Sequence, residues 1–446
     1  MKLTLKDICK KTGGTLVGAD MTVTDLVTDS RKVTDGCVFA VIKGERVDAM
    51  DFVPALDSTK TCAYLTDREI KNLNNPYILV DDVIRAIGDI AALHLDTIPA
   101  KHIAITGSVG KTTTKNYIAA ALSACMNTHY AKGNFNNELG MPLTALGADE
   151  NTDALILEMG MRGMGQIEYL CNIAKPHVSV ITNIGICHME LLGSKENILK
   201  AKCEIIDALD QNGVAVINAD DDMLSTLNPP VKTLRFGIHN QNCDIRAINV
   251  VDNTFTMLCD GKSYDMTLST LGEHNIYNAL CAAAVAYSLG CDMQKAVDGI
   301  CAFAGDGSRQ SIYNFYSFRI FDDTYNASPA SMTASMTVMG GFEGRKVLVL
   351  ADMLELGDLA ITAHSDLAKT VKKINADVVI CIGELMKNLY NALDGVEKYH
   401  CENNDLALKI LISCVKQGDN ILFKGSNSMD LAGLLAKFKG EWKNER

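Results

Sequence analysis

Residues 102–118, with the sequence HIAITGSVGKTTTKNYI, constrain the fold of this chain more than any other segment. A β-type run, a glycine turn and G-K-T-T at the start of a helix are typical of a phosphate-binding loop. The loop is short, because Ile105 stands where the usual G-x-x-x-x-G-K-[ST] motif has its first glycine, and Gly107 follows instead. Such a turn offers backbone N–H groups and the positive end of a helix to an anion. The alternative is a glycine turn followed by a solvated lysine. The sequence G-K-T-T directly after a strongly β-like run argues against that alternative.

The segment after this loop alternates strands with helices, which predicts right-handed crossovers and a parallel sheet with ligands at the carboxyl ends of its strands. Before the loop, an amphipathic pattern that starts at residue 83 predicts a helix and marks the first domain boundary. The expected strands cover 154–159, 178–184 and 213–219, and the expected helices lie near 165–174 and 194–210.

Two further blocks flank the central one. Short β-type runs at 37–42 and 63–66 indicate a small α/β domain at the N-terminus. A later block has four strands that end in polar or glycine residues, at 318–324, 346–353, 377–383 and 420–425. We therefore predict an α/β fold with three domains. They are a small N-terminal α/β domain (1–83), a central parallel-sheet P-loop-like ATPase domain (84–310) and a C-terminal Rossmann-like α/β domain (311–446).

Composition excludes several classes of function. The formal net charge is −12 without a basic tail, which argues against a nucleic-acid partner. The 15 cysteines include no C-x-x-C pair and fit a reducing compartment. No apolar run is long enough to span a membrane and the first residues lack a signal-peptide core, so we expect a cytoplasmic protein.

Several side chains near the loop have the chemistry of a nucleotide site. Lys111 can reach the β and γ phosphates, and the hydroxyl of Thr112 can bind Mg²⁺. Glu158 ends an apolar strand beside the loop strand and is a candidate metal ligand, although a surface glutamate at the start of a loop is the alternative. Arg162 could bind an anionic substrate or be a solvated loop residue.

Other candidates follow the next strand. Asn183 and His188 should open onto the same crevice, and neutral imidazole is a good metal ligand, although a hydrogen-bonded loop histidine is a serious alternative interpretation. Lys200 and Lys202 lie two apart on a helix and cannot share a face, so at most one points inward. A solvated helix face is the default reading for both lysines.

Seven segments together resemble the Mur ligase family, in the family's order, from about residue 25 to the end. The forms NFNNELGMP and DDTYNASP resemble the members that add D-alanyl-D-alanine to UDP-N-acetylmuramoyl-tripeptide. The resemblance implies that ATP phosphorylates a carboxylate and that an amine attacks the acyl phosphate. We also expect a monomer. The segments are ITGSVGKTTTK, GNFNNELGMPLT, LEMGMRGMGQIEYL, VITNIGICHMELLGSKENILKAKCEI, LGEHNIYNAL, IFDDTYNASPASM and VLADMLELG.

The resemblance also implies roles for individual residues. Lys111, Glu158, His188 and Lys202 match catalytic positions, and Thr112, Glu158, His188 and Lys202 match metal-binding positions. Lys202 matches the lysine that the family carries as an N-carbamate, while an ordinary lysine is the alternative. The expected nucleotide contacts are Thr106, Gly107, Ser108, Val109, Gly110, Lys111, Thr112, Thr113, Asn275, Asn278, Arg309 and Asp323.

Substrate contacts are expected in all three domains. Asp29, Ser30 and Arg31 resemble the uridine-diphosphate sugar site of the family. Two segments depart from the family's usual sequence: DAMDF (48–52) stands where DGHDF is expected, and AGDGSRQ (304–310) differs around Arg309. The muramoyl candidates are Asn134, Asn136 and Asn137, and the dipeptide candidates are Asn326, Ser328, Asp352 and Leu356. For the dipeptide candidates, an equally good interpretation is that they belong to loops that only cap strands and bind no substrate. Another amide ligase of the superfamily and a catalytically silent nucleotide-binding protein are the rival functions.

Overall fold

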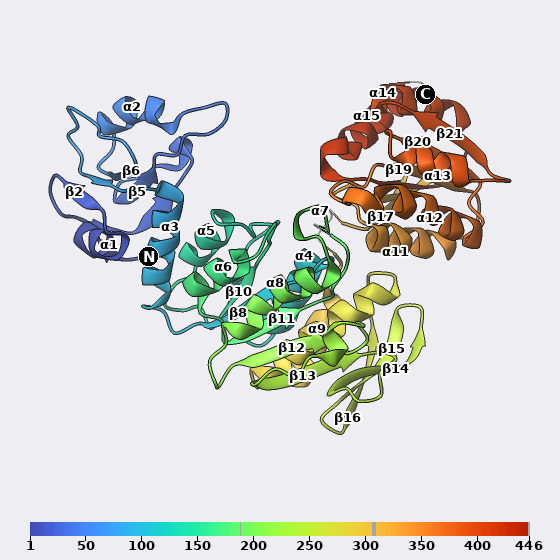
Figure 1. Ribbon diagram of the computed structural model, residues 1–446, viewed down its shortest axis with the longest axis horizontal. Coiled ribbons are helices and arrows are strands. Elements are labelled where there is room, and N and C mark those ends of the chain that lie inside the picture. Colours follow the sequence, from blue (N-terminus) through green and yellow to red (C-terminus); the bar gives the residue numbers. More distant parts are fainter. Residues whose placement is uncertain (188, 306–308, 445–446) are drawn as a thin grey trace.

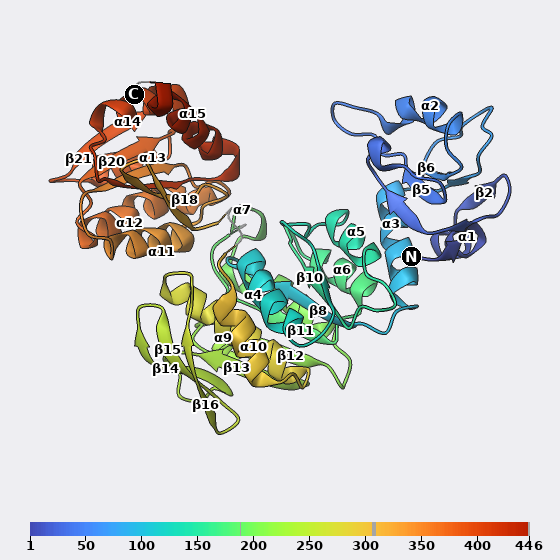
Figure 2. The ribbon, with the colours of Figure 1, turned by 180° about the vertical axis from the view of Figure 1, so that it is seen from behind.

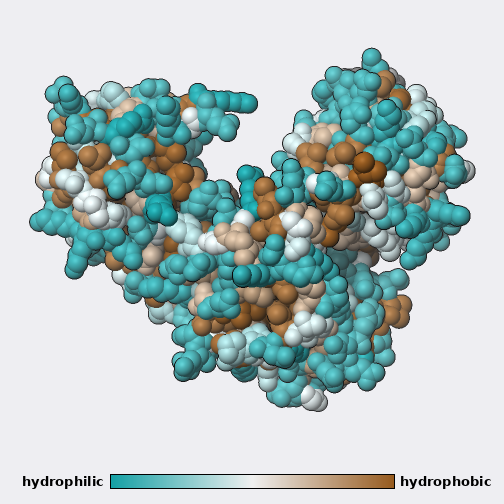
Figure 3. Space-filling view, viewed as in Figure 1, coloured by the Kyte–Doolittle hydropathy of each residue, from teal (hydrophilic) through white to brown (hydrophobic). Residues whose placement is uncertain are grey.

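The computed structural model describes residues 1–187, 189–305 and 309–444, arranged as three α/β parts in chain order (Figure 1). The N-terminal and C-terminal parts rise from opposite ends of the central part. The space-filling view shows an open hollow between them (Figure 3). None of the described helices is long and apolar enough to cross a membrane.

The N-terminal part is built on a five-stranded sheet in the order β2-β7-β6-β5-β4. Strands β4 to β7 pair in parallel and β2 pairs with β7 in antiparallel fashion. The strands expected at 37–42 and 63–66 are confirmed as β5 and β6. The strands are β1 (Leu3–Thr4), β2 (Thr15–Val17), β3 (Thr22–Val23), β4 (Asp25–Val27), β5 (Cys37–Ala40), β6 (Ala63–Thr66) and β7 (Tyr77–Leu79), and the helices are α1 (Leu5–Thr12), η1 (Ser30–Lys32), η2 (Ala49–Phe52) and α2 (Val53–Asp57).

Helix α3 (Val83–Leu95) connects the N-terminal part to the central part. Asp82 starts it by accepting hydrogen bonds from the backbone N–H groups of Ile84 and Arg85. The helix packs against α1 on one side and against α5 and α6 of the central part on the other, within one continuous apolar core. The boundary near residue 83 remains a proposal, because this helix serves both parts.

The central sheet has nine strands in the order β16-β15-β14-β13-β12-β11-β8-β10-β9. Strands β8 to β14 pair in parallel, as expected, and place the phosphate-loop strand β8 between β10 and β11. The strands are β8 (Lys101–Thr106), β9 (Thr128–Tyr130), β10 (Ala154–Glu158), β11 (Val178–Ile181), β12 (Val214–Asn218), β13 (Lys232–Gly237), β14 (Ile245–Val251), β15 (Thr254–Cys259) and β16 (Lys262–Thr267).

Strands β14 to β16 extend this sheet in antiparallel fashion, which the prediction of a parallel sheet did not include. The turn between β15 and β16 is Asp260-Gly261, and both residues have positive φ values of 50° and 71°. An Asp-Gly pair suits a two-residue hairpin turn, because both central residues of that turn need positive φ. The antiparallel edge therefore has a local signal in the sequence.

Helices cover both faces of the central sheet (Figures 1 and 2). Helices α4, α9 and α10 pack in one apolar core, and α5, α6 and α8 pack in the core on the opposite face. The helices expected near 165–174 and 194–210 are confirmed as α6 and α8. The helices are α4 (Lys111–Ser123), α5 (Gly140–Leu146), α6 (Gln166–Ala174), α7 (Met189–Leu192), α8 (Lys195–Asp207), η3 (Leu224–Thr226), α9 (Glu273–Ser288) and α10 (Met293–Ala302).

The C-terminal part has a six-stranded sheet in the order β17-β18-β22-β19-β20-β21, parallel except for β17. Its four expected strands are confirmed, and helices lie on both faces. The strands are β17 (Ser311–Phe315), β18 (Phe318–Asp323), β19 (Lys346–Ala351), β20 (Val378–Ile382), β21 (Glu397–Cys401) and β22 (Asn420–Lys424), and the helices are α11 (Pro329–Gly340), η4 (Gly357–Leu359), α12 (Ala360–Lys373), α13 (Met386–Ala392), α14 (Asn404–Cys414), η5 (Asn427–Met429) and α15 (Leu431–Asn444).

Candidate active site

A cavity of about 1440 Å³ lies where the carboxyl ends of the central strands face the C-terminal part. Ligands bind at this edge of a parallel sheet because loops and helix N-termini converge there. The phosphate loop, the end of β10, the segment after β11 and the start of α9 line one side of the cavity. The segment from the end of β18 to the start of α11 lines the other side.

The phosphate loop has a backbone that only glycine accommodates at its first turn. Gly107 has a φ of 155°, and a Cβ added there would lie 1.9 Å from Thr182 Oγ1. The loop is held from the next strand, because the Thr182 hydroxyl and the Asn183 amide both donate to Val109 O, at 2.8 and 2.9 Å. Asn183 lines the cavity as expected, but both polar atoms of its side chain form hydrogen bonds with the backbone of Val109 and so position the loop. Gly110, with a φ of 84°, then leads into α4.

The predicted ligands Thr112 and Glu158 meet directly. Thr112 donates to Glu158 Oε2 at 2.7 Å, and Asn136 Nδ2 donates to Glu158 Oε1 at 2.9 Å. Lys111 Nζ folds back to Gly107 O at 2.8 Å, and burial lowers the pKa of its ammonium group. The site therefore gathers an anionic oxygen, a hydroxyl and a cation beside the helix N-terminus.

A further cation, which the sequence did not reveal, lies behind this cluster. Lys115 is 1% exposed, and its Nζ lies 3.9 Å from Glu158 Oε2. It donates to the carbonyl oxygens of Ala131, at 2.7 Å, and of Gly133. The available signal was the spacing of Lys111 and Lys115, four apart on one face of a helix.

Lys202 of α8 is the inward lysine of its pair, since it is 2% exposed while Lys200 is exposed. Burial, together with the neighbouring Lys111 cation, lowers the pKa of Lys202 well below its usual value. Within residues 1–187, 189–305 and 309–444, its Nζ has no hydrogen bond or ion pair. His188 lies outside the described residues, and no cluster of three metal-ligating side chains occurs among the residues that are described.

The predicted nucleotide contacts of α9 form a chain of hydrogen bonds that starts on α4. Thr114 Oγ1 donates to Asn278 Oδ1 at 2.8 Å, and Asn278 Nδ2 donates to Asn275 Oδ1 at 3.1 Å. Arg309 stacks over the ring of Tyr325, with its guanidinium carbon 3.9 Å from the ring centre. Asn278 and Arg309 line the cavity.

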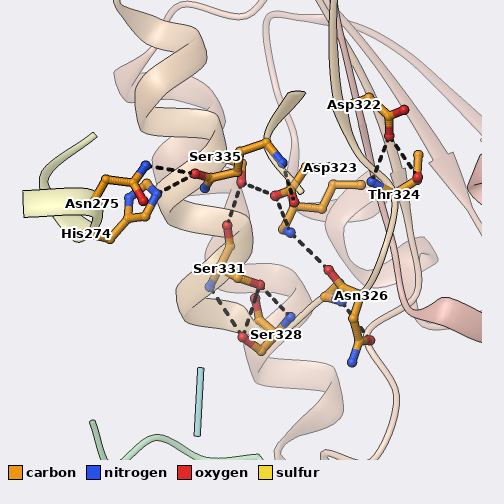
Figure 4. Close-up of polar contacts among 12 residues, drawn as sticks. His274, Asn275, Asp322, Asp323, Thr324, Asn326, Ser328, Ser331 and Ser335 are labelled. Carbon is orange, nitrogen blue, oxygen red and sulfur yellow. Dashed lines mark hydrogen bonds and ion pairs between the residues drawn. The ribbon is translucent and has the colours of Figure 1, made fainter. Parts of the chain in front are cut away.

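Asp323, at the end of β18, is enclosed by partners (Figure 4). Lys424 at 2.5 Å and the Ser335 hydroxyl at 2.6 Å both donate to Oδ2, and Gln310 N donates to Oδ1 at 3.4 Å. Burial opposes the charge of Asp323, but the Lys424 ion pair together with the hydrogen bonds from Ser335 and Gln310 outweighs that penalty and lowers the pKa of the carboxyl group. Sequence reasoning missed Lys424, and the available signal was a lysine ending the apolar strand NILFK.

A second set of contacts joins this corner to α9. His274 Nε2 lies 2.7 Å from Gln310 Oε1, and Asn275 Nδ2 donates to the same oxygen at 3.2 Å (Figure 4). Burial lowers the pKa of His274. Gln310 therefore connects α9 to Asp323, which is another expected nucleotide contact.

The remaining predicted substrate residues divide into three groups. Asn134, Asn136, Asn137, Arg162, Asn326 and Ser328 line the cavity. Asp352 and Leu356 do not: Asp352 Oδ1 accepts from Met386 N at 2.7 Å, and Leu356 is buried in the C-terminal core. Asp29, Ser30 and Arg31 lie in the N-terminal part, away from this cavity. Asp29 accepts hydrogen bonds from the Arg31 guanidinium at 2.8 and 2.9 Å.

A cavity with a phosphate-binding loop on the central sheet and a C-terminal part on its other side is typical of an enzyme that binds a nucleotide between two domains. Two family models match, the Mur ligase middle domain over residues 105–286 and the Mur ligase, glutamate ligase domain over residues 309–427. This chain belongs to the Mur ligase family.

Individual members of the family are similar over their full length. The chain is 36% identical to the UDP-N-acetylmuramoyl-tripeptide--D-alanyl-D-alanine ligase of Bacillus subtilis, with 97% of each chain covered. It is 34% identical to the Escherichia coli ligase of the same name, with 96% of each covered. The structure matches a crystal structure of MurF from Acinetobacter baumannii with a TM-score of 0.91, 29% identity and 99% of each chain covered. It also matches the MurF ligase from Thermotoga maritima in complex with ADP, with a TM-score of 0.83, 27% identity, and 95% and 99% covered.

Proposed function

We propose that this chain joins D-alanyl-D-alanine to UDP-N-acetylmuramoyl-tripeptide in an ATP-dependent reaction of peptidoglycan synthesis. The observation that carries the proposal is that the phosphate loop, the strand-end carboxylate Glu158 and the C-terminal residues Asn326 and Ser328 line one cavity. Full-length similarity to ligases of that name supports the choice of substrates. The fifteen free cysteines fit a cytoplasmic protein, and a monomer is part of the same proposal.

The residues at the loop fit a magnesium nucleotide. Thr112 and Glu158 supply a hydroxyl and a carboxylate oxygen 2.7 Å apart, and Mg²⁺ binds in proteins through one or two carboxylates together with substrate phosphates. Thr112 and Glu158 would hold the ion, and His188 is a further proposed ligand. The ion, when bound, neutralises charge on the phosphates. Lys111 and the backbone N–H groups of 107–112 contribute positive potential from the chain itself.

The reaction needs a carboxylate to become an electrophile. A carboxylate oxygen of the tripeptide attacks the γ-phosphorus of ATP, and the bond between that phosphorus and the β–γ bridging oxygen breaks to release ADP. The amine of the dipeptide then attacks the carbonyl carbon of the acyl phosphate. Phosphate leaves with the electron pair of the C–O bond, and the nitrogen loses a proton to give the amide. The chain's task is to position two anions and neutralise their charge.

Lys202 fits an N-carbamate. Carbamate formation needs the neutral amine, and burial together with the Lys111 cation favours that form. The resulting anion would lie near the cations of the loop, where a charged ammonium would be repelled. We propose that Lys202 acts as an additional metal-binding group in this form. Lys202→Ala should lose most of its turnover, and added short carboxylic acids should partly restore it, while Lys200→Ala at the exposed neighbouring position should behave as wild type.

The remaining candidate residues are proposed to bind the two substrates and the nucleotide. Asp29, Ser30 and Arg31 are proposed to bind the uridine-diphosphate sugar, and Asn134, Asn136 and Asn137 the muramoyl peptide. Asn275, Asn278, Arg309 and Asp323 are proposed nucleotide contacts. Asn326 and Ser328 are the cavity-lining dipeptide candidates, and Asp352 and Leu356 would need the C-terminal part to rearrange.

The experiment that tests the function measures ADP release with purified UDP-N-acetylmuramoyl-tripeptide and separate amines. The tubes contain D-alanyl-D-alanine, D-alanine, L-lysine or glutamate, with the diaminopimelate and lysine forms of the tripeptide. Turnover only with the dipeptide is the expected result. Failure with the dipeptide for both forms of the tripeptide would overturn the proposal.

A further inference from the structure

The buried cation Lys115 has an arrangement that the proposed reaction does not use. Its ammonium group is sealed from solvent between α4, the end of β10 and the start of the 131–139 loop. A buried charge is costly unless it is paired and hydrogen-bonded. Lys115 satisfies that condition with one carboxylate and two backbone carbonyls, at Glu158, Ala131 and Gly133.

The partners of Lys115 belong to the segment that carries the proposed muramoyl contacts. Residues 131–139 connect β9 to α5 without regular structure, and Asn134, Asn136 and Asn137 all lie on them. The far end of this loop has its own anchors, since Asn137 Oδ1 accepts from Gly140 N at 2.8 Å and Asn136 O accepts from Gly160 N at 2.7 Å. At the near end, Lys115 binds the loop through its two carbonyl contacts.

The same lysine is coupled to the nucleotide side of the site. It lies one helical turn after Lys111, on the same face of α4. Glu158, its carboxylate partner, accepts from Thr112 through one oxygen and from Asn136 of the loop through the other. One carboxylate and one lysine thus connect the phosphate-loop helix to the 131–139 loop from two sides.

We propose that Lys115 is a positioning residue that fixes the 131–139 loop on the phosphate-loop helix, so that the muramoyl substrate binds in register with the nucleotide. The proposal rests on the function proposed above. Lys115 touches no substrate; it acts through the backbone of Ala131 and Gly133 and through Glu158. Removing it leaves two carbonyls without their donor and frees the near end of the loop.

The kinetic test compares Lys115→Met with Lys132→Met. Lys132 lies on the same loop with an exposed side chain, so its variant removes the same charge without the buried contacts. In Lys115→Met, the KM for UDP-N-acetylmuramoyl-tripeptide should rise by about tenfold or more, while the KM for ATP changes by less than about threefold. Lys115→Arg, which keeps the cation and its donors, should recover part of the loss. Equal rises in both KM values, or no rise in either, would overturn the proposal.

A second readout does not depend on activity. Trypsin can cut after Lys132, and the rate of appearance of the 1–132 fragment reports how often the loop opens. Lys115→Met should speed this cleavage about tenfold, while cleavage after the exposed Lys43 of the N-terminal part stays at the wild-type rate. An unchanged Lys132 rate would overturn the proposal even if the enzyme used another substrate.

The two readouts also separate the two proposals. Wild-type enzyme that is inactive with the dipeptide, combined with faster cleavage in Lys115→Met, would reject the proposed function and keep the loop assignment. Should Lys115→Met not fold, Lys115→Gln is measured by the same cleavage assay. Its amide nitrogen is one bond nearer the backbone than the lysine Nζ and is uncharged, so it should not hold both carbonyls, and cleavage should still be faster than in the wild type. Wild-type cleavage of that variant would reject the assignment.

Discussion

A buried carboxylate ends a strand in both the central and the C-terminal sheet, and a buried lysine lies beside each, but the two pairs are built differently. At the end of β18, Lys424 lies 2.5 Å from Asp323, and Ser335 and Gln310 add further donors to the same carboxylate. At the end of β10, Lys115 lies 3.9 Å from Glu158, and its hydrogen bonds go to backbone carbonyls instead. Asp323 is neutralised by direct contact with Lys424, whereas Glu158 is not in hydrogen-bond contact with Lys115.

This difference indicates what each carboxylate can do. Glu158 receives hydrogen bonds from the uncharged groups of Thr112 and Asn136, so its charge is available to a metal ion. Asp323 is held ionised by Lys424 and is surrounded by donors, so it can position the C-terminal domain and accept at most a further neutral donor. The lysine beside a carboxylate therefore supports the proposed metal site in the central sheet and forms a structural ion pair in the C-terminal sheet.

The largest effect is expected from Glu158→Gln, which tests the central pair. The amide keeps the shape of the side chain but removes the charge that we propose binds Mg²⁺. We expect kcat to fall about a thousandfold, the scale of losing one electrostatic group of an active site. ADP-coupled turnover over a range of Mg²⁺ concentrations measures it, with the exposed Glu150→Gln as control. Turnover within tenfold of wild type would show that Glu158 is not a ligand.

The next effect concerns the C-terminal pair and appears in stability. Lys424→Met leaves Asp323 buried without its cation, which should lower the free energy of unfolding of the C-terminal domain by about 3 kcal/mol. The single tryptophan, Trp442, packs against Phe318 with ring centres 4.8 Å apart, so its fluorescence in urea follows this domain. Lys437→Met breaks only an exposed pair and should cost less than about 1 kcal/mol. Equal losses in the two variants would contradict the structural role of Lys424.

Sequence alone predicted the elements that position the site and the motif residues at their ends. The loop, the strands β8, β10 and β11, and Glu158 each have a local signal in apolar runs and turn residues. Lys115 and Lys424 had only weak signals, their positions on a helix face and at a strand end, because a lysine is normally solvated and its burial depends on partners far along the chain. Asp323 and Lys424 are 101 residues apart and meet only because β18 pairs with β22. Asp352 and Leu356 show the converse, since motif resemblance selected them and the fold turns them away from the cavity.

A smaller effect is expected in the pH dependence of stability. The pKa of Asp323 is lowered in the folded chain, so its ion pair stabilises the fold above the ordinary carboxyl range near pH 4 and loses that contribution as pH falls through the lowered pKa. Asp323→Asn should destabilise the C-terminal domain by about 2 kcal/mol at pH 7, and the gap from wild type should shrink in acid. Trp442 fluorescence in urea at several pH values measures it. If the difference in unfolding free energy between wild type and Asp323→Asn did not change with pH, the ionised carboxylate of Asp323 would contribute nothing to stability.

The smallest effect is expected from removing the one hydroxyl group that donates a hydrogen bond to each carboxylate. Ser335 Oγ donates to Asp323 Oδ2 at 2.6 Å from within α11, and Ser335→Ala removes that hydrogen bond. The loss should cost about 1 kcal/mol of stability, partly offset because alanine favours the helix by up to about 0.5 kcal/mol. Thr112→Val makes the matching change at Glu158 and should reduce turnover while leaving the urea midpoint near wild type, because Glu158 retains Asn136 as a donor. If Ser335→Ala lowered turnover as much as Thr112→Val, the two carboxylates would share one role, and the contrast between a metal-binding and a structural pair would fail.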